Sequence, residues 1–93
     1  MKLSRDMVAT RDRANTLARF MDGAAARGIK VTMPLRELYN PATQKTETRV
    51  YLAARSVVDT RDPVNLEEWV SGDIRDTIRL IALQIGIRNP KLA

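Results

Sequence analysis

Apolar residues recur along the chain in two different periods, and these periods divide it into four predicted elements. Near the N-terminus the spacing is three and four residues, which is typical of one face of a helix. The residues that form this apolar stripe are Leu3, Met7, Ala14, Leu17, Met21, Ala24 and Ala25. Ser4 can cap the helix, and Gly28 suits the left-handed position that ends one. The pattern predicts a helix over about residues 5–27.

The next segment alternates between apolar and polar residues, which is the pattern of a half-buried strand. Ile29, Val31 and Met33 begin the first run, and Pro34 places it at an edge or breaks it there. A turn signal at residues 40–43 separates this run from a second one, in which Tyr51 shares a face with arginines. We expect an antiparallel hairpin with strands over about residues 29–39 and 46–58.

The last predicted element is a helix over about residues 66–86. Its apolar positions return to helical spacing and comprise Leu66, Val70, Ile74, Ile78, Ile81 and Ile85. Asn65 followed by Glu68 resembles a capping box, and Gly86 suits the end of the helix. Ser71-Gly72 can break this helix near residues 71–72, and Ser71 would then cap the second part.

These elements predict one small α+β domain over residues 1–93, with the order helix–β-hairpin–helix (αββα). The helices are expected to pack on one face of a short antiparallel sheet. With 44% hydrophobic residues the chain can fold, but its core is modest for 93 residues. An isolated hairpin is marginal in water. Either the helices therefore also pack on each other, or a second copy extends the sheet.

The composition excludes most catalytic chemistry. The chain has no Cys and no His, so disulfides, thiol catalysis, Cys/His zinc sites and Ser-His-Asp triads are impossible. Carboxylates gather between residues 59 and 76, where they fit the positive ends of helices better than a Mg²⁺ site. The four glycines are isolated, so no phosphate-binding loop is present. We expect no enzymatic activity, no cofactor and no metal.

The net charge of +5 is unevenly distributed. Residues 1–30 carry seven basic and three acidic groups, whereas residues 59–82 carry three basic and six acidic ones. The predicted first helix holds a set of arginines, Arg5, Arg11, Arg13, Arg19 and Arg27. These arginines either contact nucleic-acid phosphates or belong to an ordinary solvated helix face, and both interpretations stay open.

The predicted last helix is more apolar than one buried face requires. Its additional apolar residues, Trp69, Leu80, Leu83 and Ile87, project to one side of the main stripe. They either pack inside the fold or form a surface for self-association or for a partner. Tyr51 and Trp69 belong to the residue types that most often anchor protein interfaces.

The leading functional hypothesis is a small, non-enzymatic regulatory or inhibitory protein that acts by protein–protein interaction as a homodimer. One alternative is a basic nucleic-acid-binding regulator, and another is a structural subunit of a phage particle. The chain begins with charged residues, and its longest apolar run is too short to span a bilayer. We therefore expect a cytoplasmic protein that does not associate with membranes. Its small size, its arginine usage and its lack of Cys indicate a bacterial or bacteriophage origin.

Overall fold

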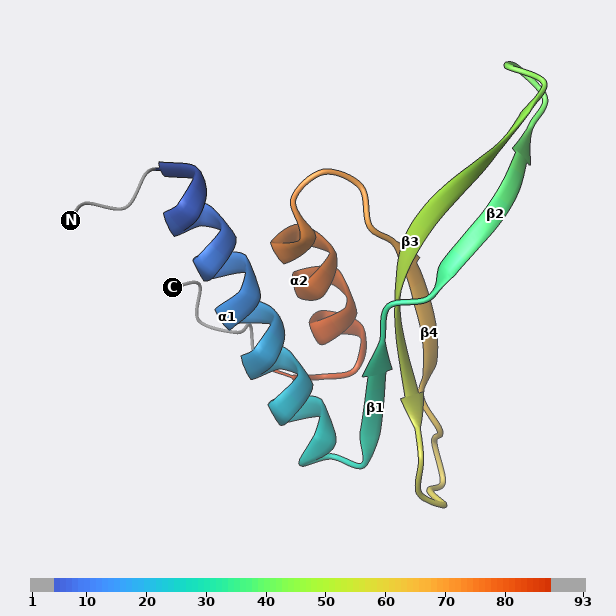
Figure 1. The fold of residues 1–93 in the computed structure, drawn as a ribbon. Helices are drawn as coiled ribbons and strands as arrows, with labels where there is room; N and C mark the ends of the chain where they lie inside the picture. The colour runs from blue at the N-terminus through green and yellow to red at the C-terminus, as the bar shows by residue number, and fades with distance from the viewer. Residues whose placement is uncertain (1–4, 88–93) are drawn as a thin grey trace.

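The computed structural model of the chain describes residues 5–87 and contains two helices and four strands (Figure 1). In chain order the elements are α1 (Arg5–Ala25), β1 (Ile29–Thr32), β2 (Leu35–Asn40), β3 (Lys45–Ser56), β4 (Asn65–Trp69) and α2 (Ile74–Gln84). The predicted α+β class and the order of helix, strands and helix are confirmed. The helix cap predicted at Ser4 and the stripe residue Leu3 lie outside the described residues.

Strands β1 and β2 run along the same side of β3 in a single register. Ile29 pairs with Ser56 in β1, and Leu35 pairs with Val50 in β2, so no residue is inserted or lost between them. Pro34 lies at the junction and has no N–H to donate. Its carbonyl still accepts a hydrogen bond from the Tyr51 N–H at 2.9 Å. The predicted hairpin thus corresponds to one long antiparallel pair that is interrupted at Pro34.

The end of this hairpin projects from the rest of the molecule. Strand β2 and the first half of β3 extend beyond both helices as a two-stranded ribbon (Figure 1). The radius of gyration is 15.3 Å, whereas a compact domain of this length is expected near 12 Å, a rough value from chain-length scaling. The ribbon therefore gives the molecule an extended shape.

Residues 65–69 form strand β4, and this corrects the prediction of a helix over residues 66–86. Strand β4 pairs with the side of β3 opposite β1, with Tyr51 opposite Trp69 and Arg55 opposite Asn65. The backbone groups of the buried part of β3 require partners on both sides, and β4 supplies the second set. The break does fall at Ser71-Gly72, but the residue that caps α2 is Asp73.

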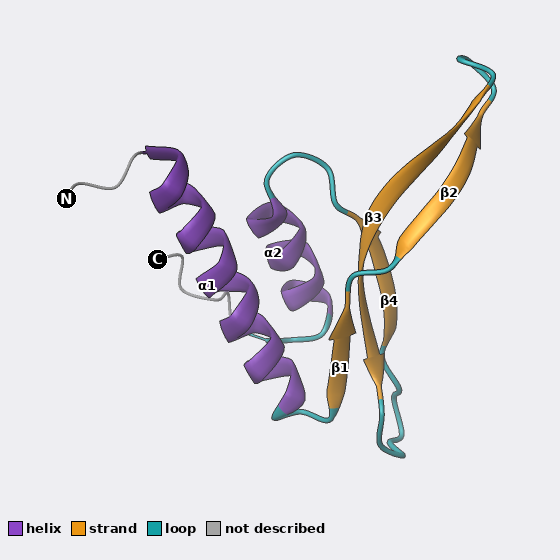
Figure 2. Cartoon of the chain, viewed as in Figure 1, coloured by secondary structure: helices purple, strands orange, loops and turns teal. Residues whose placement is uncertain are grey.

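Both helices cover one face of the sheet (Figure 2). The core between the two layers contains Phe20 from α1, Leu52 and Ala54 from β3, and Ile78 and Ile81 from α2, all at most 1% exposed. Strand β4 extends the hairpin to a larger sheet within the chain, and α1 and α2 pack on each other as well as on that sheet.

The buried face of α1 overlaps the predicted apolar stripe only in part, since Ala24 is buried and Leu17 packs against the core. Thr16, Phe20 and Ala24 point into the protein, whereas Met7 and Met21 are exposed. The Thr16 hydroxyl donates a hydrogen bond to the Asp12 carbonyl at 2.8 Å. This bond satisfies the hydroxyl inside the helix, so burying a polar residue leaves no unpaired group. A stripe chosen by apolar character alone misses such a residue.

Asp73 joins the start of α2 to α1. Its carboxylate accepts a hydrogen bond from the Arg75 N–H at 3.0 Å and another from the Arg75 guanidinium at 2.6 Å. The guanidinium of Arg13, on α1, lies 3.5 Å from the same carboxylate. Hydrogen bonds from Arg75 hold the pKa of Asp73 well below its ordinary value. The charged form of Asp73 is therefore the one that stabilises the fold.

We predict that Asp73→Asn lowers the free energy of unfolding at pH 7 by about 0.5–1 kcal/mol, because asparagine keeps the helix cap but not the charge. A lowered carboxyl pKa contributes stability that is fully present above the ordinary value of about 4 and is lost as the pH falls below it. Urea unfolding from pH 7 to pH 2 should therefore show the wild type converging on the variant.

The control for this experiment is Asp76→Asn, which removes a more exposed carboxylate from the same helical turn. Its effect should be smaller at every pH, since Asp76 lies 3.8 Å from Arg79 and accepts no bond from a helix N–H in the described structure. A difference between wild type and Asp73→Asn that stays constant from pH 7 to pH 2 would contradict the role of the charge.

Candidate interaction surface

The face of the sheet that points away from the helices forms the candidate site, which we call the open face. Side chains alternate between the two faces of a strand. Since Leu52, Ala54 and Leu66 point to the core, their neighbours point away from it. The open face consists of Lys30, Thr32, Arg36, Leu38, Asn40, Lys45, Glu47, Arg49, Tyr51, Ala53, Arg55, Asn65, Glu67 and Trp69. No helix of the described chain covers this surface (Figure 2).

Two aromatic residues and an arginine occupy the centre of the open face. Tyr51 and Trp69 are directly opposite each other on β3 and β4. The guanidinium carbon of Arg49 lies 4.0 Å from the centroid of the Trp69 ring, which is the geometry of a cation–π contact. The same guanidinium lies 2.9 Å from the carboxylate of Glu47. Trp69 remains 45% exposed and is the only tryptophan of the chain.

An ion pair spans the central strand next to these aromatic residues. The guanidinium of Arg36, on β2, donates two hydrogen bonds of 3.2 Å to the carboxylate of Glu67, on β4. Ala53 lies on the intervening strand, directly opposite Glu67, and is only 1% exposed. The hydrogen bonds with Arg36 lower the pKa of Glu67 and raise the pKa of Arg36.

The open face carries both signs of charge in an interleaved order. The face carries five cations and two carboxylates, which leaves an excess of three positive charges; the cations are Lys30, Arg36, Lys45, Arg49 and Arg55, and the carboxylates are Glu47 and Glu67. The hydrogen bond from Arg49 lowers the pKa of Glu47, so this carboxylate is charged at neutral pH. Most cations of the face therefore already have an acidic partner within the chain.

The structure divides the surface that the sequence predicts around the last helix. Tyr51 and Trp69 lie together on the open face. Leu80 and Leu83 are 53% and 62% exposed on α2, which packs against the opposite face of the sheet. Ile87 is partly buried against the core. Trp69 therefore does not share one patch with Leu80, Leu83 and Ile87. It belongs to a strand, whose side chains alternate between two faces, and not to α2, which carries Leu80 and Leu83.

The arginines of the predicted nucleic-acid surface do not form one ridge. Arg13 faces Asp73, and Arg11 lies 3.9 Å from Asp12. Arg5 and Arg19 are elsewhere on α1, while Arg27 follows its end. Three arginines of the open face, Arg36, Arg49 and Arg55, are not among the site residues predicted from the sequence. The period-two alternation of β3 nevertheless places Arg49 and Arg55 on the face of Tyr51.

Within residues 5–87, no group of three acidic side chains is arranged to hold a metal ion. None of the helices in that range is long and apolar enough to cross a membrane. No protein-family model matches the chain, and no curated protein and no solved structure matches it. The geometry of the open face is consequently the basis for a functional proposal.

We predict that a double-mutant cycle of Arg49→Ala and Trp69→Ala gives a coupling free energy of about 0.5–1 kcal/mol, as expected for an exposed cation–π contact. Urea unfolding followed by circular dichroism measures the four stabilities without depending on tryptophan emission. A parallel cycle of Lys30→Ala with Trp69→Ala should show no coupling. Equal coupling in the two cycles would mean that Arg49 has no specific contact with Trp69.

Proposed function

We propose that the protein is a small, non-enzymatic regulatory or inhibitory protein that binds a protein partner through its open face. One observation carries this proposal. The only tryptophan and one of the two tyrosines lie side by side on an uncovered sheet face, and an arginine stacks on the tryptophan. Tryptophan, tyrosine and arginine are the residues that most often supply binding energy in protein interfaces.

The arrangement of charge favours a protein partner over a nucleic acid. A nucleic-acid backbone presents one negative charge after another, and its binding needs cations that are free to neutralise them. Here Arg36 and Arg49 each already contact a carboxylate of the same face. Arg49 also occupies one side of the Trp69 ring, where a base would have to stack. A protein surface of mixed charge can pair with both signs without displacing these contacts.

The central side chains of the open face are held in place before any partner binds. Arg49 is fixed between Glu47 and Trp69, and Arg36 is fixed by two hydrogen bonds to Glu67. Immobilising a long side chain on binding costs about 0.5–1.5 kcal/mol. This cost is largely met within the free protein, which favours tight association at a modest area.

The proposal includes a homodimer formed through the outward face of α2. Leu80 and Leu83 are the large apolar residues of this face, and Asp76 and Arg79 lie beside them. A two-fold contact can pair these opposite charges reciprocally. Since α2 packs on the other face of the sheet, a dimer of this kind leaves both open faces free for partners. A cytoplasmic location is part of the proposal, because a chain without Cys suits a reducing compartment.

We predict that the tagged full chain captures a protein partner from its native host and that nuclease treatment leaves this capture unchanged. Tyr51→Ala should reduce the captured amount at least roughly fivefold, the effect of losing about 1 kcal/mol at an interface anchor. Quantitative mass spectrometry with and without nuclease measures both effects.

The matched control is Tyr39→Ala, which removes the same side chain from an exposed position on the opposite face of the ribbon. It should retain the partner, and thermal unfolding confirms that both variants are folded. Loss of all captured protein after nuclease treatment would favour the nucleic-acid alternative. Equal losses in the two tyrosine variants would remove the open face as the binding site.

We also predict that the wild type associates to twice its mass of 10.5 kDa and that Leu83→Asp raises the dissociation constant at least about tenfold, since it buries a charge in an apolar contact. Leu35→Asp is the matched control, because Leu35 is similarly exposed, at 65%, but lies on the ribbon. Sedimentation equilibrium gives the constants. A stronger effect of Leu35→Asp would move the dimer contact to the ribbon.

A further inference from the structure

Two pairs of like charges stand directly opposite each other on the open face. Lys30 of β1 is opposite Arg55 of β3, and Arg36 of β2 is opposite Arg49 of β3. Like charges in direct cross-strand positions destabilise a sheet. An exposed sheet face that contains two such pairs therefore requires compensating anions.

The chain compensates only one of the two pairs fully. Arg36 contacts Glu67 at 3.2 Å, and Arg49 contacts Glu47 at 2.9 Å. Arg55 reaches the carboxylate of Glu67 only at 3.4 Å and shares it with Arg36, while its other contact is the neutral side chain of Asn65. Lys30 has no acidic partner within the described residues. Apart from Lys45 at the far end of the ribbon, the excess positive charge of the open face is therefore concentrated at Lys30 and Arg55.

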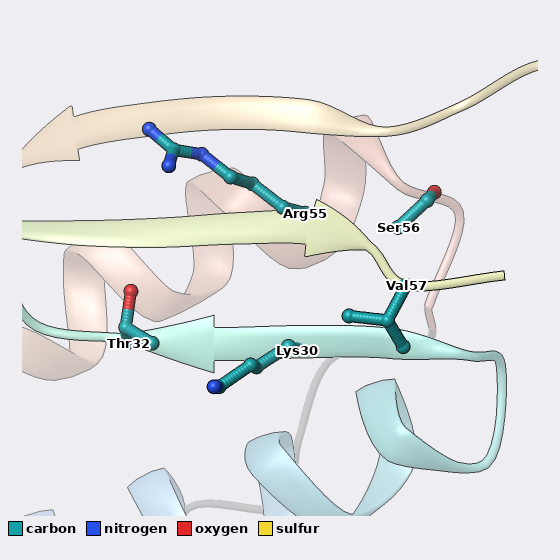
Figure 3. A pocket seen from close by; sticks show the side chains of 5 residues that line it. All are labelled: Lys30, Thr32, Arg55, Ser56 and Val57. Carbon is teal, nitrogen blue, oxygen red and sulfur yellow. The ribbon is translucent and has the colours of Figure 1, made fainter.

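A hollow of about 330 Å³ lies at this uncompensated pair (Figure 3). Its lining consists of Lys30, Thr32, Arg55, Ser56 and Val57. Lys30 and Thr32 provide an ammonium and a hydroxyl from neighbouring positions on one side of β1, and Val57 provides an apolar wall. The Ser56 hydroxyl is already engaged, because it accepts a hydrogen bond from the Val64 N–H at 2.7 Å.

We infer that this hollow binds a carboxylate of an acidic segment in the protein partner. The inference rests on the proposed function and adds the chemistry of the partner. A carboxylate placed here accepts hydrogen bonds from the Lys30 ammonium and the Thr32 hydroxyl and supplies the negative charge that the Lys30–Arg55 pair lacks. An apolar residue beside it in the segment can contact Val57 or the aromatic centre at Tyr51 and Trp69.

Charge complementarity favours an acidic protein segment over a second copy of the chain and over a nucleic-acid strand. A second copy docked through its own open face would bring an excess of three positive charges against the same excess, and the two faces would repel each other. A nucleic-acid strand would extend its phosphates from the hollow over Glu67 and Glu47, which lie on the same face. A protein segment can place a carboxylate at the hollow and other residues beyond it.

The experiment uses the full chain labelled with ¹⁵N and a blocked synthetic hexapeptide of alternating glutamate and leucine. The same peptide with glutamine for glutamate and a thymidine hexanucleotide are the comparison probes, all at one ionic strength. We expect the glutamate peptide to shift the amide signals of residues 30–32 and 55–57 and the other two probes to bind at least about threefold more weakly, which is the range of one exposed ion pair.

Two variants test the role of Lys30. Lys30→Ala should weaken binding of the glutamate peptide about two- to fivefold, as loss of one exposed ion pair does. Lys45→Ala removes the same charge from the far end of the open face, at the start of β3, and should weaken binding of the glutamate peptide less than about twofold. Lys30→Glu should abolish binding but raise the melting temperature by about 1–6 °C, because it turns the like-charge pair with Arg55 into an opposite-charge pair.

Equal weakening by Lys30→Ala and Lys45→Ala would overturn the inference, since binding would then depend on net charge alone. Tighter binding of the hexanucleotide than of the glutamate peptide would also overturn it, and so would a lower melting temperature of Lys30→Glu. These results differ from a failure of the proposed function. If Tyr51→Ala loses the captured partner and Lys30→Ala retains it fully, the open face is the binding site and the hollow is not part of it.

Discussion

The structure depends on one short segment of β3, which is paired on both sides and buried on both faces. Leu52, Ala53 and Ala54 are at most 1% exposed, and the segment lies between β1 and β4. Ala54 points to the helices, so its small side chain lets the core of Phe20, Ile78 and Ile81 close over the sheet. Ala53 points to the open face and lies opposite Glu67, which accepts two hydrogen bonds from Arg36 across the strand. The core and the candidate site therefore share the same strand, and a larger residue at either alanine would affect one of them.

Local patterns predict the elements whose partners are close in sequence, and they fail where the partner is distant. The hairpin can be predicted because its two strands are joined by a short turn and keep one register across Pro34. The prediction of a helix from residue 66 is wrong although Leu66, Val70 and Ile74 fit a helical period. Residues 65–69 form a strand because β3 has backbone groups on one side that need hydrogen-bond partners. These unpaired backbone groups exist only in the folded sheet, so the sequence of residues 65–69 does not indicate the pairing. In α1, Met7 and Ala14 fit the stripe as well as the buried residues do, so periodicity alone cannot select the inner face.

In the candidate site, too, some features can be predicted from local patterns and others depend on distant partners. The scarcity of aromatic residues singles out Tyr51 and Trp69, and the period of two along β3 places Arg49 and Arg55 beside Tyr51. The pairing of Tyr51 with Trp69 depends on β4 and could not be inferred before that strand was known. The ion pair of Arg36 with Glu67 joins residues 31 positions apart, on strands that do not pair with each other. Such a contact requires knowledge of the strand order.

A sheet that is covered on only one side exposes its other face to water, and the residues of the open face suit this exposure. An apolar outer face would need a permanent cover, because a large exposed apolar surface promotes aggregation. Here arginine side chains lie across the face, and carboxylates hold most of them, so the surface is stable in water while it still offers the stems of the arginines and two aromatic rings. A partner that binds such a face is not needed for folding, and its binding can be reversible. Reversible binding is what the proposed regulatory function requires. Under that proposal, a partner gains most from binding at the end of the face with Lys30 and Arg55, where the charges are not balanced within the chain.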